Sequence, residues 1–140
     1  MSLHIHTRHI DDVLILYISG RILGKDSNKF RDALHKASLK SDRSNIVVDL
    51  SDVQFLDSFS IGTIIVEHTF LTKQEPPRTL MIVNNNTYPF NYVGRILEFL
   101  SVDKIVPVHS FYEEAIGSQF NKEIKKIQNN LNKRQRFMIG

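Results

Sequence analysis

The hydrophobic and polar residues of this chain follow two different periods, one typical of strands and one typical of helices. Near the amino end, segments 3–10 and 13–19 alternate at every second residue, and Asp11-Asp12 separates them as a turn. This pattern predicts an antiparallel hairpin whose second strand ends at Gly20.

Three further segments have the composition of strands. Residues 46–50 and 79–83 are almost entirely apolar, as in strands covered on both faces of a sheet, and residues 104–108 form a shorter run. Apolar residues at helical spacing predict helices over about 26–37, 58–73 and 90–100, and from Ser110 onward. Asp26 or Ser27 is the predicted cap of the first helix. Strands and helices that alternate after a hairpin predict an α/β domain with a mixed, mostly parallel central sheet of about five strands flanked by about four helices.

The junction between strand 46–50 and the second helix carries the candidate chemistry. Asp57 stands where a helix N-cap is expected, and Ser58 follows it in the first turn. Unpaired backbone N–H groups and the positive end of the helix dipole stabilise anions there. The carboxyl ends of parallel strands are also the usual binding edge of an α/β sheet. Ser58 can therefore carry a reversible phosphate without disrupting the fold, which makes it a candidate switch.

The second helix has two apolar stripes. One is predicted to face the core and consists of Ile61, Ile64, Ile65 and His68. The other consists of Phe59, Thr63, Val66 and Phe70. Either neighbouring helices cover this second stripe, or it is a partner surface beside Ser58. A second candidate contact is Asn85, within the turn Asn84–Asn86 at the end of another predicted strand.

The order of these elements resembles the STAS domain family, and within it the stand-alone bacterial anti-sigma factor antagonists. The motifs that carry the resemblance are Val48-Asp49-Leu50-Ser51 and Phe55-Leu56-Asp57-Ser58, with support from Gly20, Gly62 and Tyr112-Glu113-Glu114-Ala115. The likeness covers about residues 3–120, so it implies a STAS-like (SpoIIAA-like) domain over 1–120 and leaves 121–140 as a basic C-terminal extension.

The resemblance implies a non-catalytic regulatory protein without a cofactor. In that family, an anti-sigma factor that is itself a serine kinase phosphorylates the serine after the aspartate, and a serine phosphatase reverses the modification. By position, Ser58 is the phosphoacceptor and Asp57 the capping carboxylate. The unphosphorylated form is expected to bind the kinase. The residues expected to contact it are Phe59, Ser60, Ile61, Gly62, Gly20 and Asn85.

The chain departs from the family pattern at three positions. The family usually reads Asp-Ser-Ser-Gly-Leu-Gly, whereas this chain has Phe59 in place of the second serine and Ser60 in place of the first glycine. Leu23 stands where an aspartate is common. Phe59 either hinders a kinase at Ser58 or gives the partner a hydrophobic anchor.

Composition narrows the class of protein further. Without cysteine the chain has no disulfide framework, thiolate nucleophile or cysteine zinc site. It has neither an apolar run of about 18 residues nor a signal peptide, so we expect a cytoplasmic protein without a membrane span. The net charge of the chain is +3. Six basic residues and one acid give segment 121–140 a charge of +5, so residues 1–120 carry a net charge of −2. This distribution argues against a nucleic-acid-binding face on the domain.

Several alternatives stay open at this point. A STAS subunit of a lipid-transport ATPase and a component of a stress-signalling scaffold share the expected fold, and a homodimer is compatible with all of these roles. The segment Ser58–Gly62 is one residue away from the Gly-x-Ser-x-Gly motif, which would make Ser60 the nucleophile of a small hydrolase. His4 and His6 lie on one side of a strand, but they have no third metal ligand at a suitable spacing.

Overall fold

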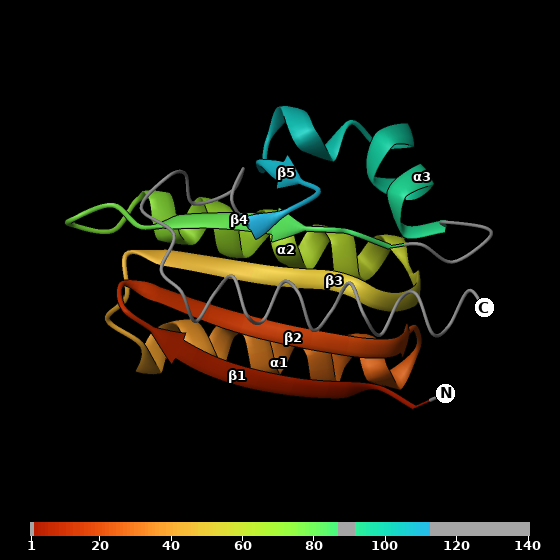
Figure 1. Ribbon diagram of the computed structural model, residues 1–140, viewed down its shortest axis with the longest axis horizontal. Coiled ribbons are helices and arrows are strands. Elements are labelled where there is room, and N and C mark those ends of the chain that lie inside the picture. The colour runs from red at the N-terminus through yellow and green to blue at the C-terminus, as the bar shows by residue number, and fades with distance from the viewer. Residues whose placement is uncertain (1, 87–91, 113–140) are drawn as a thin grey trace.

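The computed structural model describes residues 2–86 and 92–112 of the chain (Figure 1). Its elements in chain order are β1 (His4–Ile10), β2 (Val13–Ile22), α1 (Lys25–Lys40), β3 (Asn45–Leu56), α2 (Ser58–Thr72), β4 (Thr79–Val83), α3 (Tyr92–Phe99), the 3₁₀ turn η1 (Val102–Lys104) and β5 (Val108–His109). Of the helix expected from Ser110 onward, the structure describes only residues 110–112, and the basic extension 121–140 lies outside the described residues.

The five strands form one sheet in the order β1-β2-β3-β4-β5. Strand β1 is antiparallel to β2, and every later pair is parallel. The mixed sheet that opens with a hairpin is therefore confirmed. In Figure 1, α1 and α2 both lie behind the sheet, so these two helices cover the same face.

Both faces of the sheet are buried. Leu16, Val48 and Ile82 point to the face covered by α1 and α2, where Phe30 and Ile64 pack against them. Alternate residues of the same strands form a second cluster on the other face: Val13, Ile15, Val47, Met81 and Val83, together with Ile10 and Tyr112. The almost continuous apolar runs of β3 and β4 follow from this double burial.

Strands β2 and β3 are longer than the sequence pattern predicts. Gly20 does not end β2, which continues to Ile22 and pairs with β3 as far as Leu56. Residues 51–56, between the predicted strand 46–50 and the second helix, are therefore also strand. Gly20 has φ +97°, and a Cβ at this position would lie 2.3 Å from the Ser2 carbonyl oxygen. Glycine is needed here to let the strand bend past the amino end of the chain.

Two other predicted boundaries are wrong. Neither Asp26 nor Ser27 caps α1, because the N-cap is Gly24 with φ 62° and without a side-chain cap bond. The run 104–108 is not a strand over its length. The N–H groups of Ile105 and Val106 both donate to the Val102 carbonyl, which closes a turn, and pairing with β4 begins only at β5. The predicted span 79–83 is confirmed, and the predicted 58–73 ends one residue earlier, at Thr72.

Candidate functional site

Asp57 joins the amino ends of two helices. Its Oδ1 accepts hydrogen bonds from the backbone N–H of Ser60 at 2.9 Å and from the Ser60 hydroxyl at 2.7 Å. Its Oδ2 accepts a bond from the Ser27 hydroxyl at 2.5 Å. Ser27 lies in the first turn of α1 and Ser60 in the first turn of α2, so a single carboxylate caps α2 and ties it to α1. The predicted N-cap is confirmed.

These contacts also fix the charge of Asp57. Its partial burial acts to raise the pKa, but the hydrogen bonds from Ser27, Ser60 and the Gly24 backbone outweigh that effect. The pKa of Asp57 is therefore lowered from its ordinary value. At neutral pH the carboxylate is ionised and fully engaged in holding the two helices.

Ser58 is exposed and is the first residue of α2. The Asp57 side chain binds Ser60, and the Asp57 carbonyl accepts the N–H of Ile61. Ser58 and Phe59 are thus the two first-turn positions whose N–H groups lack an acceptor within the helix. A phosphate on Ser58 would meet these donors and the positive end of the helix dipole.

The second apolar stripe of α2 is exposed. Phe59 has 49% of its surface accessible, Val66 68% and Phe70 39%. The alternative that neighbouring helices cover this stripe is wrong for the described part of the chain. Residues of α1 flank the stripe at both ends: the Arg31 guanidinium lies 5.9 Å from the Phe59 ring centre, and the rings of His35 and Phe70 meet edge to face at 5.5 Å.

Three of the residues expected to contact a partner are buried. Ser60 and Ile61 face the core, and Gly20 is enclosed within β2. Since both side chains point into the protein, they do not belong to the surface beside Ser58. A hydrolase nucleophile must be reachable, so the Ser60 hydroxyl, buried and bonded to Asp57, does not fit that role.

Asn85 follows β4 at the carboxyl side of the sheet and contacts β3. The pairing of β3 with β4 ends at Asp49 and Val83, so the last seven residues of β3 project beyond β4. The Asn85 backbone N–H donates to the Ser51 hydroxyl at 2.9 Å. Ser51 precedes Asp57 by six residues of mostly extended chain, or roughly 20 Å. The Asn86 side-chain amide also donates to the Val53 carbonyl at 2.6 Å, so this turn lies along the part of β3 that leads to Ser58, and Asn85 stays a predicted contact.

Sequence reasoning missed a buried polar cluster between α1 and α2. Glu67 is buried, its carboxylate accepts a hydrogen bond from the Ser38 hydroxyl, and its Oε2 lies 3.0 Å from His35 Nδ1. Glu67 is the only charged residue of α2, and it lies three residues after Ile64 on the core side. A single acidic residue on the predicted core side of this helix was the available sequence signal.

A second buried carboxylate lies in the middle of β3. Asp49 accepts hydrogen bonds from the Tyr112 hydroxyl and from the Ser51 backbone N–H. Burial raises the pKa of Asp49 above its ordinary value, and these hydrogen bonds offset only part of that effect. The tyrosine links the segment after β5 to the central strand of the sheet.

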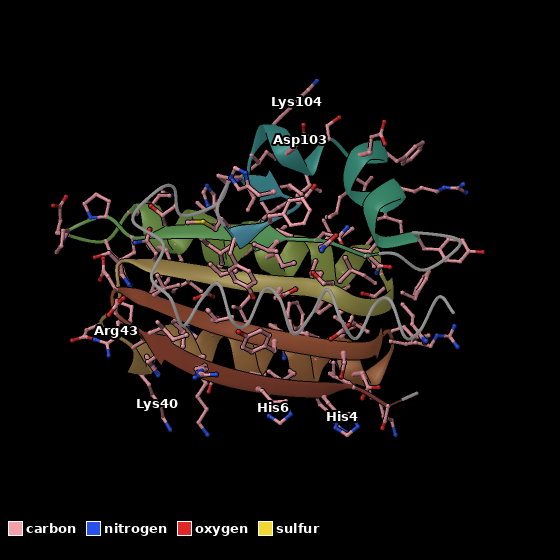
Figure 2. The ribbon with its side chains drawn as sticks, viewed as in Figure 1. His4, His6, Lys40, Arg43, Asp103 and Lys104 are labelled. Carbon is pink, nitrogen blue, oxygen red and sulfur yellow. The ribbon has the colours of Figure 1, made fainter. Side chains whose placement is uncertain are left out.

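The remaining sequence signals do not form sites within the described residues. His4 and His6 project from the edge strand β1 away from the sheet (Figure 2). In residues 2–86 and 92–112, no three His, Asp or Glu side chains cluster in a way that could hold a metal ion. No helix in this part of the chain has the length and apolar character needed to cross a bilayer.

Comparison with known proteins agrees with this geometry. Residues 4–115 match the STAS domain family. A curated relative, the anti-sigma F factor antagonist of Paenibacillus polymyxa, is 27% identical over 109 residues, which cover 78% of this chain and 88% of the relative.

Solved structures share the fold. An anti-sigma factor antagonist from Mycobacterium paratuberculosis has a TM-score of 0.66 at 22% identity, covering 82% of this chain and 92% of that one. The Bacillus cell fate determinant SpoIIAA in its phosphorylated form has a TM-score of 0.56 at 14% identity, covering 82% and 96% of the two chains. The family match spans most of the sequence and the sheet order agrees with it, so this chain belongs to the STAS domain family.

Proposed function

We propose that this protein is an anti-sigma factor antagonist, a non-catalytic binding protein that engages an anti-sigma factor serine kinase and is released by phosphorylation of Ser58. The observation that carries the proposal is that different residues cap α2 and present the exposed hydroxyl at its start. Asp57 and the buried Ser60 hold the helix, while Ser58 is exposed beside the exposed Phe59. The acceptor hydroxyl is reachable, and the fold does not depend on it.

The physical basis of release is charge. A phosphate on Ser58 adds about −1.5 to −2 charges at neutral pH, directly beside the ionised Asp57. The helix terminus tolerates this charge locally, but an acidic group of a docked partner would be repelled by several kcal/mol. Since each 1.4 kcal/mol changes affinity about tenfold, one phosphate is sufficient to release the partner. A serine phosphatase acting on phospho-Ser58 would restore binding.

Two relatives support this role. The Paenibacillus polymyxa protein is an anti-sigma F factor antagonist, and the Bacillus structure with the same fold contains a phosphorylated form. A protein that acts on a sigma factor works where transcription takes place, so we expect this chain in the cytoplasm. The roles in a lipid-transport ATPase or a stress-signalling scaffold would use the same fold with a different partner, and co-purification would identify it.

Phosphorylation can be tested directly. The protein is incubated with ATP and each anti-sigma factor serine kinase of its source organism, and its intact mass is measured. The proposal predicts the addition of a single phosphate, which peptide mapping assigns to Ser58. Ser58→Ala is expected to remain unmodified, whereas Ser44→Ala, which changes an exposed loop serine, is expected to behave like the wild type. A wild type that stays unmodified, or a phosphate that persists in Ser58→Ala, would reject the proposal.

A further inference from the structure

A groove of about 890 Å³ runs between α1 and α2, lined by residues of both helices. Its apolar lining consists of Leu39 from α1 and of Phe59 and Val66 from α2. All three are at least 49% exposed, so no described part of the chain covers them. The groove therefore offers a hydrophobic surface that begins next to Ser58 and continues along both helices.

The lining residues have helical spacing on α2. Phe59, Gly62 and Val66 follow one another at intervals of three and four residues, so they form one stripe along the helix. At Gly62, in the middle of this stripe, an added Cβ would meet no other atom within 4 Å. The absence of a side chain leaves room for the backbone of a second helix to approach closely. A stripe with this spacing fits an amphipathic helix laid into the groove.

The groove is held in shape by the polar cluster described above. Glu67 of α2 binds Ser38 and His35 of α1, and His35 and Glu67 also line the groove. Because these bonds cross from one helix to the other, the spacing of α1 and α2 is fixed before any partner binds. A preformed groove lowers the entropic cost of binding.

The charge of the rim is positive. Arg31, Lys36 and Lys40 line the groove from α1 and are exposed, against the single exposed carboxylate of Asp32. The only charge on α2 is Glu67, which is buried and bonded to α1. A helix that fits this groove therefore needs an apolar stripe flanked by acidic residues.

We infer that the α1/α2 groove binds an acidic amphipathic helix of the protein partner. The inference rests on the proposed function for the identity of that partner, the anti-sigma factor. It also explains how the switch acts, since an acidic helix that begins over Phe59 lies beside Ser58 and meets the negative charge of a phosphate there. Ser58 and the groove are then two parts of one surface.

The chemistry of the groove can be tested without the partner. The probe is a synthetic stapled helical peptide of about 18 residues with leucines at helical spacing and glutamates on both flanks. A second peptide has lysines in place of the glutamates. Binding to the full-length protein is measured by fluorescence anisotropy. We expect the acidic peptide to bind at least about tenfold more tightly than the basic one.

Charge reversal on the protein gives the matched test. Lys36→Glu/Lys40→Glu is expected to abolish the preference for the acidic peptide. The control Arg95→Glu/Lys104→Glu alters exposed residues of α3 and η1 and is expected to leave this preference unchanged. Lys40 and Lys104 project from opposite sides of the molecule (Figure 2). If the acidic peptide does not bind, if both peptides bind equally, or if the preference survives reversal at Lys36 and Lys40, the inference is wrong.

Gly62→Ala separates binding from folding. Alanine is a better helix former than glycine, and its methyl group would occupy open space in the groove. We expect this variant to be at least as stable as the wild type but to bind the acidic peptide at least about threefold more weakly. Unchanged affinity would contradict the inference. The peptide tests use neither kinase nor ATP. Their failure would therefore not contradict phosphorylation at Ser58, and a failure of phosphorylation would not contradict helix binding in the groove.

Discussion

Asp57 and Ser58 are neighbours in sequence but have separate tasks. The Asp57 carboxylate accepts bonds from Ser27 and Ser60, whereas Ser58 faces solvent. Because another residue caps α2, the exposed Ser58 hydroxyl is not needed to hold the first turn. In this chain the cap comes from the preceding aspartate.

The separate tasks of Asp57 and Ser58 predict that alanine substitutions at the two positions change the stability by different amounts. Asp57→Ala removes the N-cap of α2 and the link to α1, and it should lower the free energy of unfolding by about 1–2 kcal/mol. Ser58→Ala should change it by no more than about 0.5 kcal/mol, as expected for an exposed side chain. Urea unfolding followed by circular dichroism measures both. A loss for Ser58→Ala as large as that for Asp57→Ala would mean that the serine is structural.

Tyr112 and Asp49 give a prediction that depends on pH. Tyr112→Phe removes a hydrogen bond to a buried carboxylate, and it should lower stability by about 1–3 kcal/mol at pH values where Asp49 is charged. The folded-state pKa of Asp49 is already raised, so the native state binds the proton more tightly than the unfolded chain. Asp49 therefore lowers stability as the pH rises from its ordinary pKa through the raised one.

The cost of Tyr112→Phe should accordingly shrink as the pH falls through the raised pKa, because protonated Asp49 depends less on the lost donor. The measurement is urea unfolding of wild type and variant over a series of pH values that starts near the ordinary aspartate pKa and extends upward. The charge of Asp57 affects the free energy of unfolding with the opposite sign, because its pKa is lowered. This stabilisation is present above the ordinary pKa of Asp57 and is lost as the pH falls through the lowered pKa. A penalty for Tyr112→Phe that does not change with pH would show that the lost hydrogen bond is not coupled to the charge of Asp49.

At the scale of elements, the sequence predicts well what is decided locally. Helix α2 and strand β4 were found within one residue because capping, helical spacing and a dense apolar run are properties of the segment itself. The ends of β2 and β3 were wrong because each strand is prolonged by pairing with the other, which no local pattern reveals. The last strand is predicted over 104–108 but pairs with β4 only at Val108 and His109, because its place too is decided by pairing.

The same distinction holds for the candidate site. Asp57 as the cap followed from its place before a helix, and that prediction is confirmed. Whether the Phe59 stripe is covered depends on the neighbouring helices, so the sequence left it open. The distance between Asn85 and Ser58 depends on how far β3 projects beyond β4. The burial of Ser60 depends on which way the first turn of α2 faces, and it too appeared only in the structure.

The exposed stripe of α2 predicts an effect on binding rather than on folding. Phe59→Ala should weaken binding to the kinase partner at least about tenfold, since exposed aromatic residues next to a docking site often carry much of the affinity. Its melting temperature should change little, because the ring is already half exposed. Phe99→Ala is the matched control: Phe99 lies at the end of α3 and is 86% exposed. Equal affinities for the two variants would remove Phe59 from the interface.

At the scale of the whole molecule, the switch requires no change of fold. The sheet, the two buried clusters and the link from Asp57 to Ser27 lie behind the surface that contains Ser58 and the α1/α2 groove. A negative charge on that surface alters what the partner meets, while the core retains its contacts.

The central claim is that negative charge at residue 58 releases the kinase, and titration calorimetry with the purified kinase tests it most directly. The proteins compared are the wild type, Ser58→Asp, Ser58→Ala, and Thr7→Asp, which adds the same charge on the exposed side of β1. The switch predicts that Ser58→Asp binds at least about a hundredfold more weakly than the wild type, whereas Ser58→Ala and Thr7→Asp bind as tightly. Equal affinity of the wild type and Ser58→Asp would contradict it.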